Sequence, residues 1–297
     1  MPKLEENLNH VLDRYAQMVH AWQLKYKMPD NVVNALKLMA TKWQKGIKAS
    51  RASYIIPVGK KISILQNRVP GRDIPDIESL LISLDVVINT LDDTVDVLAE
   101  TKKDKWEREI IKIINFLNIF VELNQVIDNS QSRALILDNT FNFIISLTQI
   151  PFTEKEYSRK ILAAQSLEME RDIAMQCLWD RAQDVNIFTQ LLIFYFNIDS
   201  SYGEILGKTI RSYRALELFC KDYFDIDTDK KEQSNTPVLS LLEKHGHQKE
   251  GLRKVLIDIQ DRLYSKLQKN LLQNEVGELL IELGQEKYKD LAQKIKI

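Results

Sequence analysis

The chain has few glycines and prolines, the residues with which proteins most often reverse direction. It holds 9 glycines and 7 prolines in 297 residues, whereas average usage predicts roughly 20 and 15. No glycine lies between Gly71 and Gly203, and only Pro75 and Pro151 interrupt that interval. β-Sandwiches and doubly wound α/β domains need turn residues roughly every ten positions. The scarcity therefore excludes these classes and favours long helices with few loops.

Cysteine is also scarce, and neither sign of charge is in excess. Cys177 and Cys220 are the two cysteines of the chain. Nothing in the sequence supports a disulfide between them, and a metal site lacks further ligands, so we expect two core thiols in a reducing compartment. The chain carries 41 basic and 42 acidic residues. This balance produces no overall field that attracts nucleic acid, and we expect no nucleic-acid partner.

Long hydrophobic runs are missing as well. The most apolar window, residues 187–196, is far shorter than the roughly 20 residues that span a bilayer. The N-terminal segment, MPKLEENLNH, is polar and lacks the apolar stretch of a signal peptide. We therefore expect a cytoplasmic protein without a membrane span.

Apolar residues recur at steps of three and four along nearly the whole chain, as in Ile77, Leu80, Leu81, Leu84 and Ile88. This is the pattern of amphipathic helices. No repeat or long linker divides the chain, so we predict one all-α domain over residues 1–297. The predicted helices span 4–26, 30–50, 77–100, 105–127, 131–149, 154–180, 184–197, 202–225, 237–245, 249–270 and 275–295.

The predicted helix 77–100 carries an acidic stripe. Asp85, Asn89, Asp92 and Asp96 follow one another at steps of four, three and four, and Asp93 widens the stripe. Carboxylates at this spacing repel one another, and Mg²⁺ would remove the repulsion while leaving coordination positions for a phosphate. The segment 92–96 is a DDxxD motif, which predicts a metal–diphosphate site. The alternative interpretation is a solvated acidic face.

A second acidic cluster closes the predicted helix 202–225. Asp222, Asp225 and Asp229 follow one another at steps of three and four and share one face. The helix dipole opposes carboxylates near a C-terminus, so an uncompensated cluster is unfavourable there. Two acidic helix faces are able to hold metal ions between them.

These two motifs, which lie far apart in the chain, resemble the aspartate-rich motifs of trans-isoprenyl diphosphate synthases. Further segments resemble that family's motifs in the same order, although each match is imperfect. They are Gly59-Lys60-Lys61-Ile62 for GKRxRP, Lys102-Lys103 for an Arg pair, Ala164-Gln165-Ser166-Leu167-Glu168 for GQxxD, Thr189 for the Thr of a Lys-Thr pair, and Thr236-Pro237 after the second motif.

The resemblance implies an isoprenoid synthase-like bundle of about ten long helices around a central cavity. It implies a Mg²⁺-dependent prenyltransferase that joins isopentenyl diphosphate to an allylic diphosphate, and a homodimer or a heteromer with a related subunit. The implied metal ligands are Asp92, Asp93, Asp96, Asp222 and Asp225. The implied catalytic residues are Asp92, Asp96, Lys60 and Lys102. The implied substrate-binding residues are Lys60, Lys61, Lys102, Lys103, Gln165 and Thr189, with Val87 and Ile88 at the chain-length position, where the absence of bulky aromatics predicts a product longer than C15.

Departures from the family pattern keep other interpretations open. Ser63 and Ile64 replace an Arg and a Pro, Phe188 replaces a Lys, and Lys221 replaces the first Asp of the second motif. These losses favour a second hypothesis, a non-catalytic subunit of the same fold that binds prenyl chains or a partner synthase. A class I terpene cyclase ranks third, because no NDxxSxxxE pattern follows. The lysines at helix ends or in loops, Gln165 on a charged surface and Thr189 in the core also have purely structural interpretations.

Overall fold

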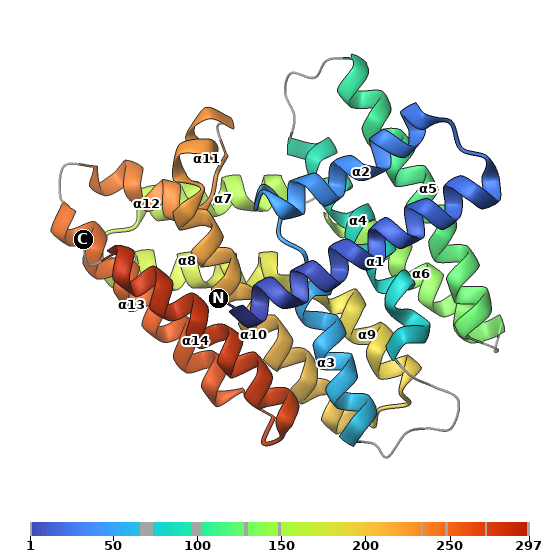
Figure 1. The fold of residues 1–297 in the computed structure, drawn as a ribbon. Coiled ribbons are helices and arrows are strands. Elements are labelled where there is room, and N and C mark those ends of the chain that lie inside the picture. The colour runs from blue at the N-terminus through green and yellow to red at the C-terminus, as the bar shows by residue number, and fades with distance from the viewer. Residues whose placement is uncertain are drawn as a thin grey trace. The chain divides into compact units, whose positions relative to one another are not determined.

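The computed structural model describes residues 2–65, 74–96, 102–127, 130–147, 150–232, 234–246, 249–270 and 272–295. The regular structure of these residues consists of α-helices and one 3₁₀ turn, without a strand, which confirms the all-α class (Figure 1). The helices are α1 (Pro2–Tyr26), α2 (Asp30–Gln44), α3 (Ala52–Leu65), α4 (Ile74–Asp96), α5 (Lys102–Val126), α6 (Ser130–Leu147), α7 (Ile150–Ala163), α8 (Leu167–Arg181), η1 (Ala182–Val185), α9 (Asn186–Tyr195), α10 (Ser200–Phe224), α11 (Ile226–Glu232), α12 (Pro237–His245), α13 (Lys249–Lys269) and α14 (Glu275–Ile295).

Backbone contacts divide the chain into two compact units. The first comprises Met1–Ile144 with Phe194–Asn197, and the second comprises Ile145–Ile193 with Ile198–Ile297. The single domain and the central cavity expected from the sequence stay predictions. Within the described residues, no helix is both long and apolar enough to span a membrane.

The first unit is built around α4. This helix packs against α1, α3 and α5, and α1 also packs along α2 (Figure 1). Tyr15 of α1 is buried and places its ring edge-on to Trp22 and Trp43. Such aromatic pairs combine a large buried area with a preferred geometry, so the Tyr15–Trp43 pair fixes α1 against α2.

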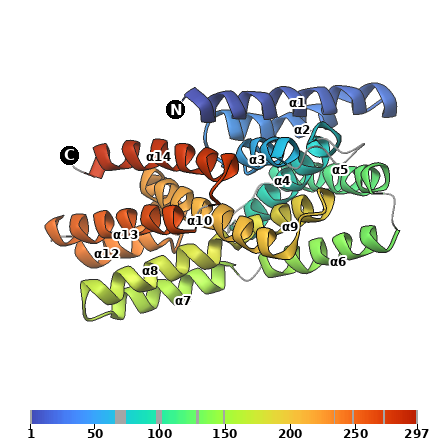
Figure 2. The same cartoon turned by 90° about the horizontal axis from the view of Figure 1, so that it is seen from below.

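The second unit is built around α10, which packs against α8, α12, α13 and α14 (Figure 2). Its apolar stripe includes the fully buried Leu206, Ile210, Tyr213 and Phe219. Asp199 caps the helix, because its carboxylate accepts the Tyr202 N–H at 2.9 Å. Cys177 and Cys220 are free and buried, as the sequence predicts.

Most predicted helices are present, but two boundaries are wrong and the short helix α11 was not predicted. The predicted helix 30–50 ends at Gln44, and Gly46 beyond it has φ 68°, a left-handed conformation that terminates helices. The predicted helix 154–180 is two helices, since Ser166 starts α8 by accepting the Met169 N–H at 3.2 Å. The short α11 lies between the predicted helices 202–225 and 237–245, where no helix was predicted.

Helix α3 was not predicted, because Pro57 and Gly59 lie inside it. Both residues disfavour a helix interior. Burial outweighs that preference, since Ala52, Tyr54 and Ile55 are all fully buried. This helix carries Lys60 and Lys61, which the sequence assigned to a diphosphate-binding segment.

Candidate functional site

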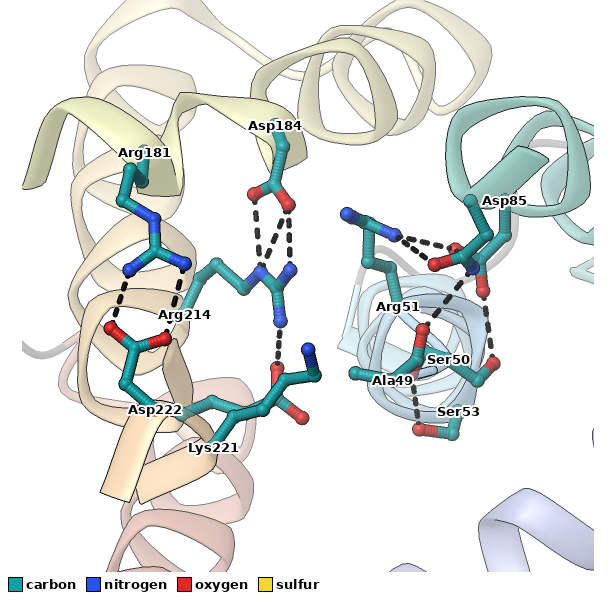
Figure 3. A network of polar contacts seen from close by, with 12 residues as sticks. Ala49, Ser50, Arg51, Ser53, Asp85, Arg181, Asp184, Arg214, Lys221 and Asp222 are labelled. Carbon is teal, nitrogen blue, oxygen red and sulfur yellow. Dashed lines mark hydrogen bonds and ion pairs between the residues drawn. The ribbon is translucent and has the colours of Figure 1, made fainter. Parts of the chain in front are cut away.

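The acidic stripe of α4 begins inside the protein. Asp85 is 0% exposed and Asn89 is 2% exposed. The Asp85 carboxylate accepts hydrogen bonds from Ser50 Oγ at 2.9 Å and from Arg51 Nη1 at 3.2 Å (Figure 3). It also accepts the Ala52 backbone N–H at 3.1 Å. A solvated acidic face therefore does not describe this part of the helix.

The contacts of Asp85 and Asn89 tie α4 to the start of α3. Asn89 donates from Nδ2 to Asp85 at 3.1 Å and to the Ala49 carbonyl at 3.2 Å, and its Oδ1 accepts from Arg51 at 3.2 Å. Burial raises the pKa of Asp85, while Arg51 and the hydrogen bonds from Ala52 and Ser50 oppose that rise. Arg51 was not singled out in the sequence, because it is distant from Asp85 in the chain and belongs to no motif.

The DDxxD motif forms the C-terminal end of α4. Asp92, Asp93 and Asp96 lie in the last two turns of that helix, and Lys102 and Lys103 begin α5. The side chains of these residues lie outside the part of the chain whose side chains the structure describes. Where side chains are described, no group of three His, Cys, Asp or Glu residues could hold a metal ion. The metal and catalytic roles of the motif stay predictions.

Lys60, a residue of α3, contacts α4 near the end of that helix that is opposite to the motif. Its Nζ is 3.6 Å from the buried carboxylate of Glu78, which also contacts His10 at 3.0 Å. Glu78 precedes Asp92 by about four helical turns, which is about 21 Å along the helix axis. Arg51 meets α4 at Asp85, about two turns and therefore about 10 Å before Asp92. Of the two cations, Arg51 therefore contacts α4 closer to the motif than Lys60 does.

The chain-length residues Val87 and Ile88 are buried in α4, at 2% and 1% exposure. They pack in the apolar interior of the first unit. Their predicted role at the end of a prenyl channel stays a prediction. Lys61 lies on α3 and is partly exposed.

Residues of the second acidic motif form ion pairs with basic side chains. Asp222 is 2% exposed and accepts two hydrogen bonds from Arg181, at 2.5 Å from Nη1 and 3.1 Å from Nη2 (Figure 3). Arg181 also places Nε 2.6 Å from Glu154. Burial alone would lower the pKa of Arg181, but the charges of Asp222 and Glu154 raise it well above its usual value. The arginine is therefore permanently charged and neutralises Asp222.

The remaining residues of that motif are close to a second cation. Lys221 Nζ lies 3.4 Å from Asp225 Oδ2. Asp229 accepts a hydrogen bond from Thr236 Oγ1 at 3.2 Å. Burial and the negative charge of Asp222 together raise the pKa of Asp229 to about 6. In the described structure, Arg181 and Lys221 place positive charge beside Asp222 and Asp225. The predicted metal role of these two carboxylates stays a prediction.

A third charged cluster was missed in the sequence. Arg214 donates to Asp184 from Nε at 3.1 Å and from Nη2 at 2.7 Å, and to Glu217 from Nη1 at 2.8 Å. All three side chains are buried. The i, i+3 spacing of Arg214 and Glu217 is visible in the sequence, but Asp184 belongs to a different, distant segment of the chain, so no local signal identifies the cluster.

Two predicted substrate-binding residues have contrasting positions. Gln165 is exposed in the connection between α7 and α8. Thr189 is buried, and its hydroxyl donates to the Val185 carbonyl at 3.1 Å within the same helical segment. Neither position shows contact with a predicted ligand group, and both roles stay predictions.

No model of a known protein family matches this chain, and no curated protein sequence is significantly similar to it. The resemblance to trans-isoprenyl diphosphate synthases therefore depends on the sequence motifs alone.

Proposed function

We propose that the protein is a Mg²⁺-dependent prenyltransferase that condenses isopentenyl diphosphate with an allylic diphosphate to a linear polyprenyl diphosphate. The observation that supports it best is the position of the DDxxD motif at the end of α4. The helix is buried from Ile77 through Thr90, and its polar stripe is buried at Asp85 and Asn89. The acidic residues thus extend a helix that is fixed by the core, as a preorganised binding site requires.

The donor set fits the metal. Asp92, Asp93 and Asp96 offer carboxylate oxygens, the ligands that Mg²⁺ prefers, and Lys102 and Lys103 offer ammonium groups for a diphosphate. The metal ion would supply charge neutralisation for the departing diphosphate. The lysines would orient that diphosphate while the allylic carbon–oxygen bond breaks and the double bond of isopentenyl diphosphate attacks the allylic carbon. A proton lost from the adduct restores the double bond, and inorganic diphosphate leaves.

The experiment is an extension assay with the full-length protein. Purified protein is incubated with Mg²⁺, labelled isopentenyl diphosphate and allylic diphosphates of several chain lengths, and both products are measured. We expect extension that EDTA abolishes and that Asp92→Asn reduces at least about 100-fold, a loss typical of removing one transition-state contact. Asp138→Asn is the matched control, because Asp138 is exposed on α6. Equal activity in the two variants would contradict the proposal.

A second candidate function is a non-catalytic subunit that binds a prenyl chain or a partner synthase. The pairing of Asp222 with Arg181 favours it, since that carboxylate is already neutralised by a buried arginine. This candidate predicts no extension by the protein alone. It also predicts that a related synthase becomes more active when the protein is added, and that the increase survives Asp92→Asn.

A further inference from the structure

Two cations from different helices share one indole ring in the second unit. Trp179 is near the end of α8, and the Lys266 Nζ of α13 lies 3.5 Å from its ring centroid. The Arg211 Cζ of α10 lies 4.4 Å from the same centroid. Helices α8, α10 and α13 pack against one another (Figure 1), so this arrangement, here called the Trp179 cluster, rests on rigid elements.

Arg211 is held in place by the backbone. Its Nε and Nη2 donate to the Trp179 carbonyl at 2.9 and 2.7 Å. Among the hydrogen bonds of the described residues, none uses Nη1 of this arginine, so one edge of the guanidinium keeps its donors. The arginine is therefore oriented before any ligand arrives.

The carboxylate next to the Trp179 cluster already accepts hydrogen bonds from other side chains. Asp180 is the nearest carboxylate, 3.7 Å from Arg211, and it accepts hydrogen bonds from Tyr157 at 2.6 Å and Gln176 at 2.9 Å. The Lys266 Nζ makes no ion pair and no hydrogen bond with the described part of the chain. Asp184 also acts electrostatically on Arg211, but its carboxylate is paired with Arg214. The Lys266 ammonium, which lies over the indole ring, has no carboxylate partner among the described residues.

Burial and neighbouring charges shift the pKa values of both cations. Burial lowers the pKa of Lys266, and Arg211 lowers it further, while Asp180 opposes the effect. Burial also lowers the pKa of Arg211, while Asp180 and Asp184 oppose the effect. The shift at Lys266 means that its positive charge is unfavourable in this partly buried position beside Arg211, and a bound anion would relieve that cost.

We propose that the Trp179 cluster is a binding site for an oxyanion of the phosphate type. The Arg211 guanidinium would contact it through Nη1, and the Lys266 ammonium would supply the second set of donors. Charged donors of this kind form strong hydrogen bonds with phosphate oxygens. The site is independent of the DDxxD motif, and it requires no metal ion.

The test is a titration of the full-length protein with inorganic phosphate in EDTA, at constant ionic strength, followed by calorimetry. We expect saturable binding that Lys266→Gln weakens at least tenfold. Lys254→Gln is the matched control, because it removes an exposed lysine from the same helix and is expected to bind like the wild type. Equal affinity in wild type and Lys266→Gln, or equal weakening by both variants, would overturn the proposal. EDTA separates this result from the metal-dependent function proposed above.

A second measurement does not depend on the variants. The NMR signal of Lys266, in protein whose lysines carry ¹³C-methyl groups, reports the pKa of its amine, and saturation with phosphate is expected to raise that pKa. An unchanged pKa at saturation would place the anion elsewhere and overturn the proposal.

A parallel experiment compares binding to vesicles that contain phosphatidic acid with binding to vesicles of pure phosphatidylcholine. Phosphate binding alone assigns the site to soluble oxyanions, binding of both extends it to lipid headgroups, and binding of neither contradicts it.

Discussion

Buried Arg51 and Asp85 show how single residues carry much of this structure. Their side chains are 6% and 0% exposed, and the Asp85 carboxylate also accepts the N–H of Ala52, the first residue of α3. Removing one partner from such a pair leaves a buried charge without compensation, which costs more than the pair itself contributes. The cost of a substitution here is therefore much larger than that of a surface ion pair.

For Arg51→Ala we expect a loss of about 3–5 kcal/mol in the free energy of unfolding, measured with urea. Replacing Asp85 by Asn in the same variant removes the orphaned charge and is expected to restore part of the loss. Arg262→Ala is the control. It breaks a half-exposed pair with Asp258 and is expected to cost less than about 1 kcal/mol. Similar losses of unfolding free energy in Arg51→Ala and Arg262→Ala would show that the buried ion pair contributes no more than the surface pair.

Asp229 predicts a specific dependence of stability on pH. Its pKa is raised to about 6 in the folded protein, against 3.8 for the ordinary side chain. The folded state therefore holds this proton more tightly than the unfolded state does. The resulting stabilisation is complete below the unfolded pKa and is lost as the pH rises through about 6.

In urea unfolding from pH 4 to 7.5, Asp229→Asn is expected to lose less stability than the wild type as the pH rises. Asp227→Asn, a neighbouring exposed position on α11, is expected to follow the wild-type profile. If the profile of Asp229→Asn parallels that of the wild type, Asp229 does not titrate as described here.

Close packing decides the position of α14 against α13. A Cβ at Gly284 would lie 2.5 Å from Leu267 Cδ2, and the Leu267 side chain is itself fully buried. The same addition at Gly207, on α10, would meet its nearest atom, Thr189 Cγ2, at 3.7 Å, an ordinary contact distance. Two helical glycines thus have opposite packing constraints.

We expect Gly284→Ala to destabilise the protein by about 1–3 kcal/mol through overpacking. Gly207→Ala is expected to stabilise it by as much as about 1 kcal/mol, because alanine is the better helix former. Urea unfolding of both variants is the measurement. A stabilising Gly284→Ala would mean that Leu267 moves aside at little cost.

At the scale of the whole molecule, the chain forms two compact units, each organised around one long helix. Each central helix carries an aspartate motif near its C-terminus, α4 at Asp92 and α10 at Asp222. In the second unit that motif is neutralised by Arg181 and Lys221. The proposed metal chemistry therefore depends on the first motif, and the extension assay with Asp92→Asn is its direct test.

The sequence by itself determined the all-α class, because few glycines and prolines and a persistent spacing of three and four leave little room for other folds. It also determined most helix positions. It failed at α3, where Pro57 and Gly59 argue against a helix that burial nevertheless stabilises. Local preferences amount to a few kcal/mol at most, so tertiary packing overrides them.

Only the tertiary structure decided how the charged residues are used. Asp85, Asp92 and Asp222 look alike in the sequence as members of acidic stripes. The partners of Asp85 and Asp222 come from distant parts of the chain, Arg51 for the first and Arg181 for the second. The free energy of a buried carboxylate depends on which cation the fold places beside it, and periodicity along one helix carries no information about that cation.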